Sequence, residues 1–62
     1  MMWTYINGML TNMDSQTLER IHSMLKMFAN TECTMHELEQ FLSRKIREGK
    51  LMCAGGVYKL VT

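Results

Sequence analysis

The sequence predicts a mainly α-helical domain that ends in a β-hairpin, which is the element order of a winged helix. Three observations predict this fold: three segments with helical apolar periodicity, a capping-box motif before the third, and a Gly-Gly turn between two short apolar strands. In such a domain the last two helices form a helix-turn-helix unit and the two-stranded hairpin forms the wing. A chain of 62 residues has room for one small core, so we expect a single domain over residues 1–62.

The first predicted helix covers about residues 1–12. At about 100° per residue its apolar side chains share one stripe, and Thr4, Asn7 and Thr11 fall on the opposite side. Gly8 lies among these polar residues and is expected to weaken the helix by roughly 1 kcal/mol relative to alanine. The apolar stripe consists of Met2, Trp3, Ile6, Met9, Leu10 and Met13.

A polar break at residues 12–17 separates the first helix from the second. Asp14, Ser15 and Thr17 within it are all suitable N-cap residues. The second helix then carries a stripe that we expect to be buried, while Met27 points outward. The stripe consists of Leu18, Ile21, Leu25 and Phe28, flanked by His22 and Met24.

The third predicted helix begins at a capping box, in which Thr34 is followed by Glu37, and it ends at about Glu48. Gly49 suits the left-handed residue that closes a helix. Lys45 falls within the apolar stripe, so its ammonium must extend to water. The stripe consists of Met35, Leu38, Phe41, Leu42 and Ile46, and the outward face of His36, Gln40, Ser43, Arg44 and Arg47.

The predicted wing has strands at residues 51–54 and 57–61, joined by Gly55 and Gly56. A two-residue Gly-Gly loop permits the positive backbone angles of a tight hairpin turn. Pairing across it sets Cys53 opposite Tyr58 and Leu51 opposite Leu60, and these four side chains are expected to cover the helices. The other face carries Met52, Ala54, Val57 and Lys59.

Composition argues against several classes of function. The net charge is only +1, which argues against nucleic-acid binding because affinity for phosphates increases with the number of clustered basic contacts. Two cysteines are too few for a secreted disulfide framework, so a reducing intracellular location is the simpler account. No apolar run approaches the roughly 18 residues of a membrane helix. The eight methionines suit either irregular core gaps or an adaptable binding surface.

Few residues in the sequence are candidates for metal binding or catalysis. Cys33 and His36 have a spacing seen in zinc sites, and His22 and Cys53 could complete four ligands. We expect His36 to point outward and Cys53 inward, which one ion cannot bridge. A Cys-His nucleophile would also need a cleft that 62 residues scarcely enclose. The sequence therefore predicts no enzyme, no metal and no cofactor.

Several segments, taken in order, resemble one protein family over essentially the whole chain. They are Trp3-Thr4-Tyr5-Ile6, Met9-Leu10-Thr11-Asn12, Leu18-Glu19-Arg20-Ile21, Met24-Leu25-Lys26-Met27-Phe28, Glu37-Leu38-Glu39 and Ala54-Gly55-Gly56-Val57-Tyr58-Lys59-Leu60. The combination resembles the C-terminal winged helix of the cullin-like subunit of the anaphase-promoting complex, a member of the cullin family. The resemblance implies that the chain is the C-terminal fragment of a longer protein.

The resemblance also implies a function in a ubiquitin ligase that ubiquitinates cell-cycle proteins in the nucleus and cytoplasm. The domain would grip the back of a ubiquitin-conjugating enzyme while a neighbouring RING subunit engages its other surface, raising the local concentration of that enzyme. In ordinary cullins this domain presents a lysine that receives a ubiquitin-like modifier. The nearest position here is Asn7, and no lysine precedes Lys26, so we expect no such modification.

The candidate partner-binding surface combines the outward face of the third helix with one face of the wing. It consists of Gln40, Ser43, Arg44, Arg47, Met52, Val57 and Lys59. DNA-binding relatives insert the third-helix face into the major groove, so a nucleic-acid-binding transcription regulator is the alternative. Two arginines on a near-neutral domain supply few phosphate contacts, and arginine is enriched at protein interfaces. Two further interpretations stay open: the outward face of the third helix is simply solvated, or the domain only packs against the rest of its own complex.

Overall fold

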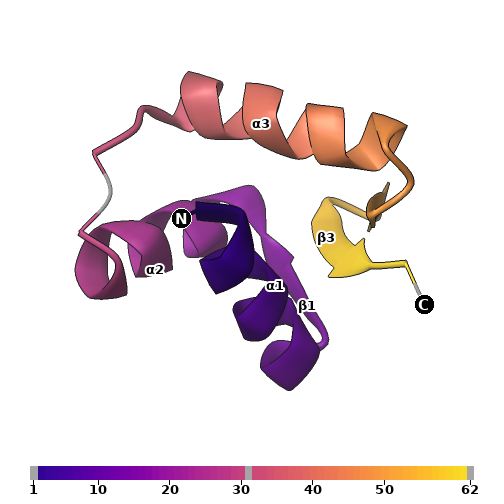
Figure 1. Cartoon of the computed structure of the whole chain (residues 1–62), viewed down its shortest axis with the longest axis horizontal. Coiled ribbons are helices and arrows are strands. Elements are labelled where there is room, and N and C mark those ends of the chain that lie inside the picture. The colour runs from indigo at the N-terminus through magenta and orange to yellow at the C-terminus, as the bar shows by residue number, and fades with distance from the viewer. Residues whose placement is uncertain (1, 31, 62) are drawn as a thin grey trace.

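The computed structural model describes residues 2–30 and 32–61, which form three helices and a three-stranded antiparallel sheet (Figure 1). The elements in chain order are α1 (Met2–Met13), β1 (Ser15–Thr17), α2 (Leu18–Phe28), α3 (Met35–Arg47), β2 (Leu51–Ala54) and β3 (Val57–Leu60). In Figure 1, α3 lies across the top, α1 and α2 lie beneath it, and β3 lies below its C-terminal end. The mainly α-helical, winged-helix-like arrangement predicted from sequence is confirmed. Residues 1 and 62, the expected ends of the domain, lie outside the described residues.

The sheet has the strand order β1-β3-β2. The predicted register of the hairpin is confirmed, with Leu51 opposite Leu60 and Cys53 opposite Tyr58. Both turn glycines have positive φ, 60° at Gly55 and 82° at Gly56, as a tight hairpin turn requires. The wing was expected to have two strands, but β1 pairs with the other edge of β3 and makes the sheet three-stranded.

The core lies where the three helices meet the sheet. Nine hydrophobic residues from α1, α2, α3, β2 and β3 are buried there, which confirms the central positions of all three predicted helical stripes. Trp3 and Phe41 are half-buried and pack against this cluster. The buried residues are Ile6, Met9, Leu10, Ile21, Leu25, Leu38, Leu42, Leu51 and Tyr58.

The capping residues predicted from the sequence lie at the ends of α2 and α3. The Thr34 hydroxyl accepts a hydrogen bond from the amide of Glu37 at 3.0 Å, and the Glu37 carboxylate accepts one from the amide of Thr34 at 2.8 Å. This reciprocal pair is the predicted capping box of α3. Thr17 caps α2 through a single bond from the Arg20 amide at 3.2 Å. Gly49 follows α3 with a φ of 79°, as predicted.

Three side chains that we expected to be buried are exposed. Phe28 is 61% exposed and Met13 is 42% exposed, and both lie at the last residue of their helices. Helical periodicity gives the direction of a side chain, whereas burial also needs a neighbour at that level of the axis. Cys53 is exposed for a related reason, since it lies near the tip of the wing, two residues beyond the buried Leu51.

Lys45 lies within the apolar stripe, as expected, and its ammonium group ends beside an exposed carboxylate. Its side chain is only 14% exposed, and its ammonium pairs with the carboxylate of Glu48 at 3.2 Å. The ammonium also lies 5.2 Å from the ring centre of Trp3 and 5.3 Å from that of Phe41. These two cation–π contacts let a basic residue sit within an otherwise apolar stripe.

Candidate protein-binding surface

The exposed face of α3 carries four of the seven predicted contact residues. Leu38 and Leu42 are fully buried, so the residues on the opposite side of the helix face solvent. Gln40, Ser43, Arg44 and Arg47 are all exposed, as predicted.

Charge on this face is available to a partner. Both ion pairs among the described residues involve Glu48, with Lys45 at 3.2 Å and with Lys50 at 3.7 Å. The hydrogen bond from Lys45, together with the nearby charge of Lys50, lowers the pKa of the Glu48 carboxyl. Arg44 and Arg47 have no carboxylate within 4.0 Å in the described part of the chain. Their guanidinium groups can therefore bind an external carboxylate without first breaking an internal ion pair.

The wing supplies the other three predicted residues. Met52 pairs with Lys59 across the hairpin, and Ala54 pairs with Val57. Met52 is 44% exposed, while Val57 and Lys59 are half-buried. The face of the wing that carries Met52 therefore offers apolar surface next to one ammonium group.

Two of the predicted residues also border the end of α1. Met52 and Lys59 line a hollow of about 470 Å³ between the wing and the C-terminal end of α1, and no residue of α3 contributes to it. The hollow is lined by Leu10, Thr11, Asp14, Met52, Lys59, Leu60 and Val61. The sequence did not associate the end of α1 with the wing, because β1 places them together and β1 itself was not predicted.

The residues considered for zinc do not converge. Nε2 of His22 lies 2.7 Å from the backbone carbonyl oxygen of Cys33, which ties α2 to the following loop. His36 is exposed on α3, and Cys53 is exposed on the wing. Both cysteines are free thiols. Residues 2–30 and 32–61 contain no group of three or more potential metal ligands.

Comparison with known proteins identifies the family. A family model described as "Anaphase promoting complex (APC) subunit 2" matches residues 5–60, which is most of the chain. The chain belongs to this family.

Relatives from distant organisms agree with the assignment. The chain is 46% identical over 63 residues to anaphase-promoting complex subunit 2 of Mus musculus, covering 94% of this chain and 8% of that protein. It is 47% identical over 62 residues to the Schizosaccharomyces pombe protein, covering 94% and 9%. It is 43% identical over 60 residues to the Arabidopsis thaliana protein, covering 90% and 7%. The chain thus spans less than a tenth of the length of these curated relatives.

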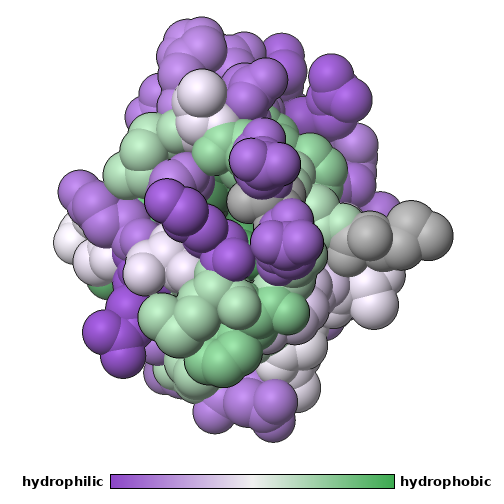
Figure 2. All heavy atoms as spheres, turned by 90° about the vertical axis from the view of Figure 1, so that its left-hand side faces the viewer, coloured by the Kyte–Doolittle hydropathy of each residue, from purple (hydrophilic) through white to green (hydrophobic). Residues whose placement is uncertain are grey.

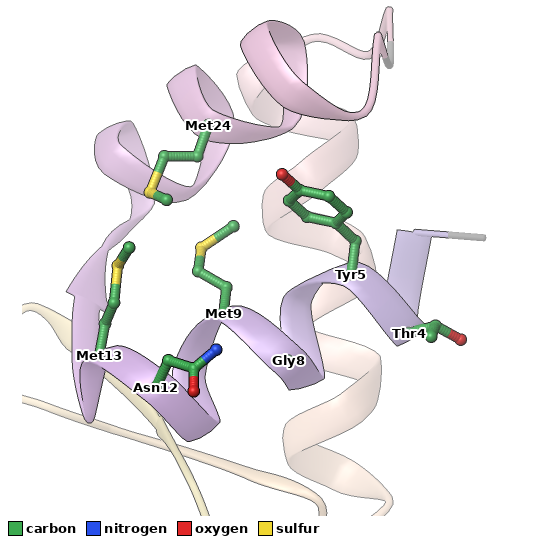
Figure 3. Close-up of a pocket in the computed structure, with 7 residues that line it drawn as sticks. All are labelled: Thr4, Tyr5, Gly8, Met9, Asn12, Met13 and Met24. Atoms are coloured by element: carbon green, nitrogen blue, oxygen red, sulfur yellow. The ribbon is translucent and has the colours of Figure 1, made fainter.

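In this member of the subunit 2 family, three methionines gather in a second hollow, between α1 and α2 (Figure 3). Met9 and Met13 from α1 and Met24 from α2 project into the same space, together with the ring of Tyr5. The hollow has a volume of about 480 Å³, and none of its lining residues is charged. Flexible thioethers suit such an irregular gap, and three of the eight methionines border it.

Apolar side chains are also exposed where α2 ends. Met27 is 69% exposed, as predicted, and lies next to the exposed Phe28. Figure 2 shows the side of the molecule that lies at the left of Figure 1, and its apolar surface is interrupted by polar side chains. Within the described residues, no helix is both long and apolar enough to cross a membrane.

Proposed function

We propose that this chain is a non-catalytic interaction module of a cullin-RING-type ubiquitin ligase, the anaphase-promoting complex, and that it recruits a ubiquitin-conjugating enzyme. The match to the subunit 2 family over residues 5–60 carries this proposal. Its further partners would be other subunits of the ligase, including a RING subunit, and its setting the nucleus and cytoplasm during cell-cycle protein ubiquitination. In this proposal the chain acts as one winged-helix domain of a longer protein.

The outward face of α3 and the wing form the proposed docking surface. Arg44 and Arg47 are exposed and free of internal ion pairs among the described residues, so they can meet carboxylates of the partner. Met52 supplies exposed apolar area, and Gln40 and Ser43 add hydrogen-bonding groups beside the arginines. An apolar contact with a polar, arginine-bearing rim is the usual composition of a protein interface.

A module of this kind acts through proximity. A weak contact between this domain and the conjugating enzyme becomes effective once a second contact is made elsewhere in the ligase, because the second binding event is then intramolecular. Effective concentrations from such linkage reach the order of millimolar for short flexible connections. No catalytic group is required of this domain, whose task is to hold and position the enzyme.

Titration of the isotope-labelled domain with a panel of ubiquitin-conjugating enzymes tests the proposal. We expect at least one enzyme to shift the amide signals of α3 and the wing, with little change at the buried face of α2. Failure of the whole panel to bind, or shifts confined to α1 and α2, would remove the proposed recruitment.

The alternative is that the domain binds nucleic acid, and the outward arginines of α3 are the observation that favours it. Ionic strength separates the two functions. DNA binding weakens steeply with added salt because counterions are released, whereas a largely apolar protein interface responds weakly. Duplex DNA binding in the micromolar range at physiological salt, with a steep salt slope, would support the alternative.

A further inference from the structure

Asp14 is placed where local energetics disfavours an aspartate. It follows the last residue of α1 and has a φ of 70°, a left-handed conformation that glycine or asparagine adopts at lower cost. Its amide donates to the carbonyl of Leu10 at 3.0 Å, which continues the end of the helix. Its carboxylate therefore adds negative charge to the negative end of the helix dipole.

No charged residue of α1 balances the negative charge of Asp14. The last turn of α1 contains no basic residue, and the described residues contain no cation within 4.0 Å of the Asp14 carboxylate. Residues that break several local rules at once are expected at functional sites. The carboxylate of Asp14 is thus left without an ion-pair partner among the described residues.

This negative end borders the hollow between α1 and the wing. Four of the seven lining residues are large and apolar: Leu10, Met52, Leu60 and Val61. The charged ones are Asp14 and Lys59, which do not form an ion pair with each other. A hollow of about 470 Å³ that combines four apolar side chains with a carboxylate that has no ion-pair partner matches a long aliphatic side chain that ends in a cation.

We propose that this hollow is a second docking site, which binds a segment of the protein partner carrying an arginine or lysine next to a large apolar residue. The apolar side chain and the aliphatic stem of the basic one pack against Met52 and Leu60, and the cation binds the carboxylate of Asp14. Lys59 donates to a backbone carbonyl of the bound segment.

The inference rests on the proposed function, in which this domain binds a partner protein, and extends it from α3 to the end of α1. Met52 belongs to both surfaces, so a partner that covers the wing can reach both. Tests with a short peptide separate the two proposals, because the peptide needs no conjugating enzyme.

The experiment uses the acetylated, amidated tetrapeptide Gly-Leu-Arg-Gly and the same peptide with citrulline in place of arginine. Citrulline keeps the shape of arginine and removes its charge. We expect the arginine peptide to shift the amide signals of Thr11, Asp14, Met52 and Lys59 in the labelled domain. The citrulline peptide is expected to bind about five-fold more weakly, the value of a favourable exposed ion pair.

The variant Asp14→Asn completes the test. It is expected to bind both peptides equally and weakly, and also to raise Tm by about 2–4 °C, because a charge that opposes the helix dipole is removed. Glu32→Gln removes the same charge from the exposed loop after α2 and is the matched control, with binding unchanged. Equal affinity of the native chain for the two peptides, no binding of the arginine peptide, or shifts at α3 alone would overturn the proposal.

Discussion

Gly8 shows how a single residue can lower the stability of this domain without a packing reason within the chain. It lies in the middle of α1, where glycine loses more backbone entropy on folding than any other residue. A methyl group added there would meet no atom within 4 Å, and its φ is not positive. Gly49 has the same open surroundings but a φ of 79°.

We predict that Gly8→Ala stabilises the domain by about 0.5–1 kcal/mol, the difference in helix propensity. Gly49→Ala is the matched control, and it should destabilise by about 1 kcal/mol because alanine is strained at positive φ. Urea denaturation of both variants measures the two effects. Changes of the same sign would show that backbone conformation does not govern these glycines.

Tyr58 makes stability depend on pH in the alkaline range. Burial, with smaller contributions from Cys53 and Glu39, raises the pKa of the Tyr58 hydroxyl above its usual 10.0. The folded state therefore favours the protonated phenol, so its contribution is complete below pH 10 and is lost as pH rises through the folded-state pKa.

We predict that thermal stability falls above about pH 10 and that Tyr58→Phe makes this fall shallower. Tyr5→Phe, which removes a half-buried phenol from α1, is the control and should keep the native profile. Melting curves between pH 8 and about 11.5 provide the comparison. An identical alkaline slope in the native chain and Tyr58→Phe would be evidence against this assignment.

Sequence reasoning predicted the centres of the apolar stripes and missed their ends. Ile21, Leu25, Leu38 and Leu42 are fully buried as expected, because each lies in mid-helix with neighbours on both sides. Phe28 continues the stripe of α2 but is the last residue of that helix, and its side chain is 61% exposed. Only the tertiary arrangement fixes how far along its axis each helix is covered, so this exposure could not be predicted.

At the level of elements, the two N-caps differ in a way that the sequence already indicates. Thr34 and Glu37 exchange two hydrogen bonds at the start of α3, whereas Thr17 makes one at the start of α2. Both threonines are exposed, so their replacement leaves the core intact.

We predict that Thr34→Ala lowers the free energy of unfolding by about 1–2 kcal/mol and that Thr17→Ala costs less, about 0.5–1 kcal/mol. The reason is that the first change breaks a reciprocal pair and the second a single bond. Chemical denaturation of the two variants gives the ranking. A larger loss for Thr17→Ala would contradict the capping account.

Strand β1 could not be predicted from local sequence patterns. Ser15, Gln16 and Thr17 are all polar, so they show no alternation of apolar and polar residues, and Ser15 and Thr17 were expected as helix-capping residues. They form a strand only because β3 offers its free edge, with Gln16 opposite Tyr58. Cross-strand pairing between distant segments carries no local signal, so the grouping of the wing with α1 followed from the structure alone.

At the scale of the whole molecule, these 62 residues form only a small core, so we expect the isolated chain to have a low free energy of unfolding. Its core consists of nine buried residues, and cutting one of the fully buried leucines back to alanine would cost about 2–5 kcal/mol, enough to unfold it. Tests of binding must therefore use surface residues. Arg44 and Met52 meet this condition, since both are exposed and neither belongs to the core.

The affinity of the domain for its conjugating enzyme, measured in the native chain, Arg44→Glu, Met52→Glu and the control Met27→Glu, tests the central claim most directly. Met27 is more exposed than Met52 and lies on α2, which contributes no residue to the proposed surface. We predict about ten-fold weaker binding for each of the first two variants, with the native fold retained, and native affinity for the control. Unchanged affinity in both Arg44→Glu and Met52→Glu would contradict the central claim.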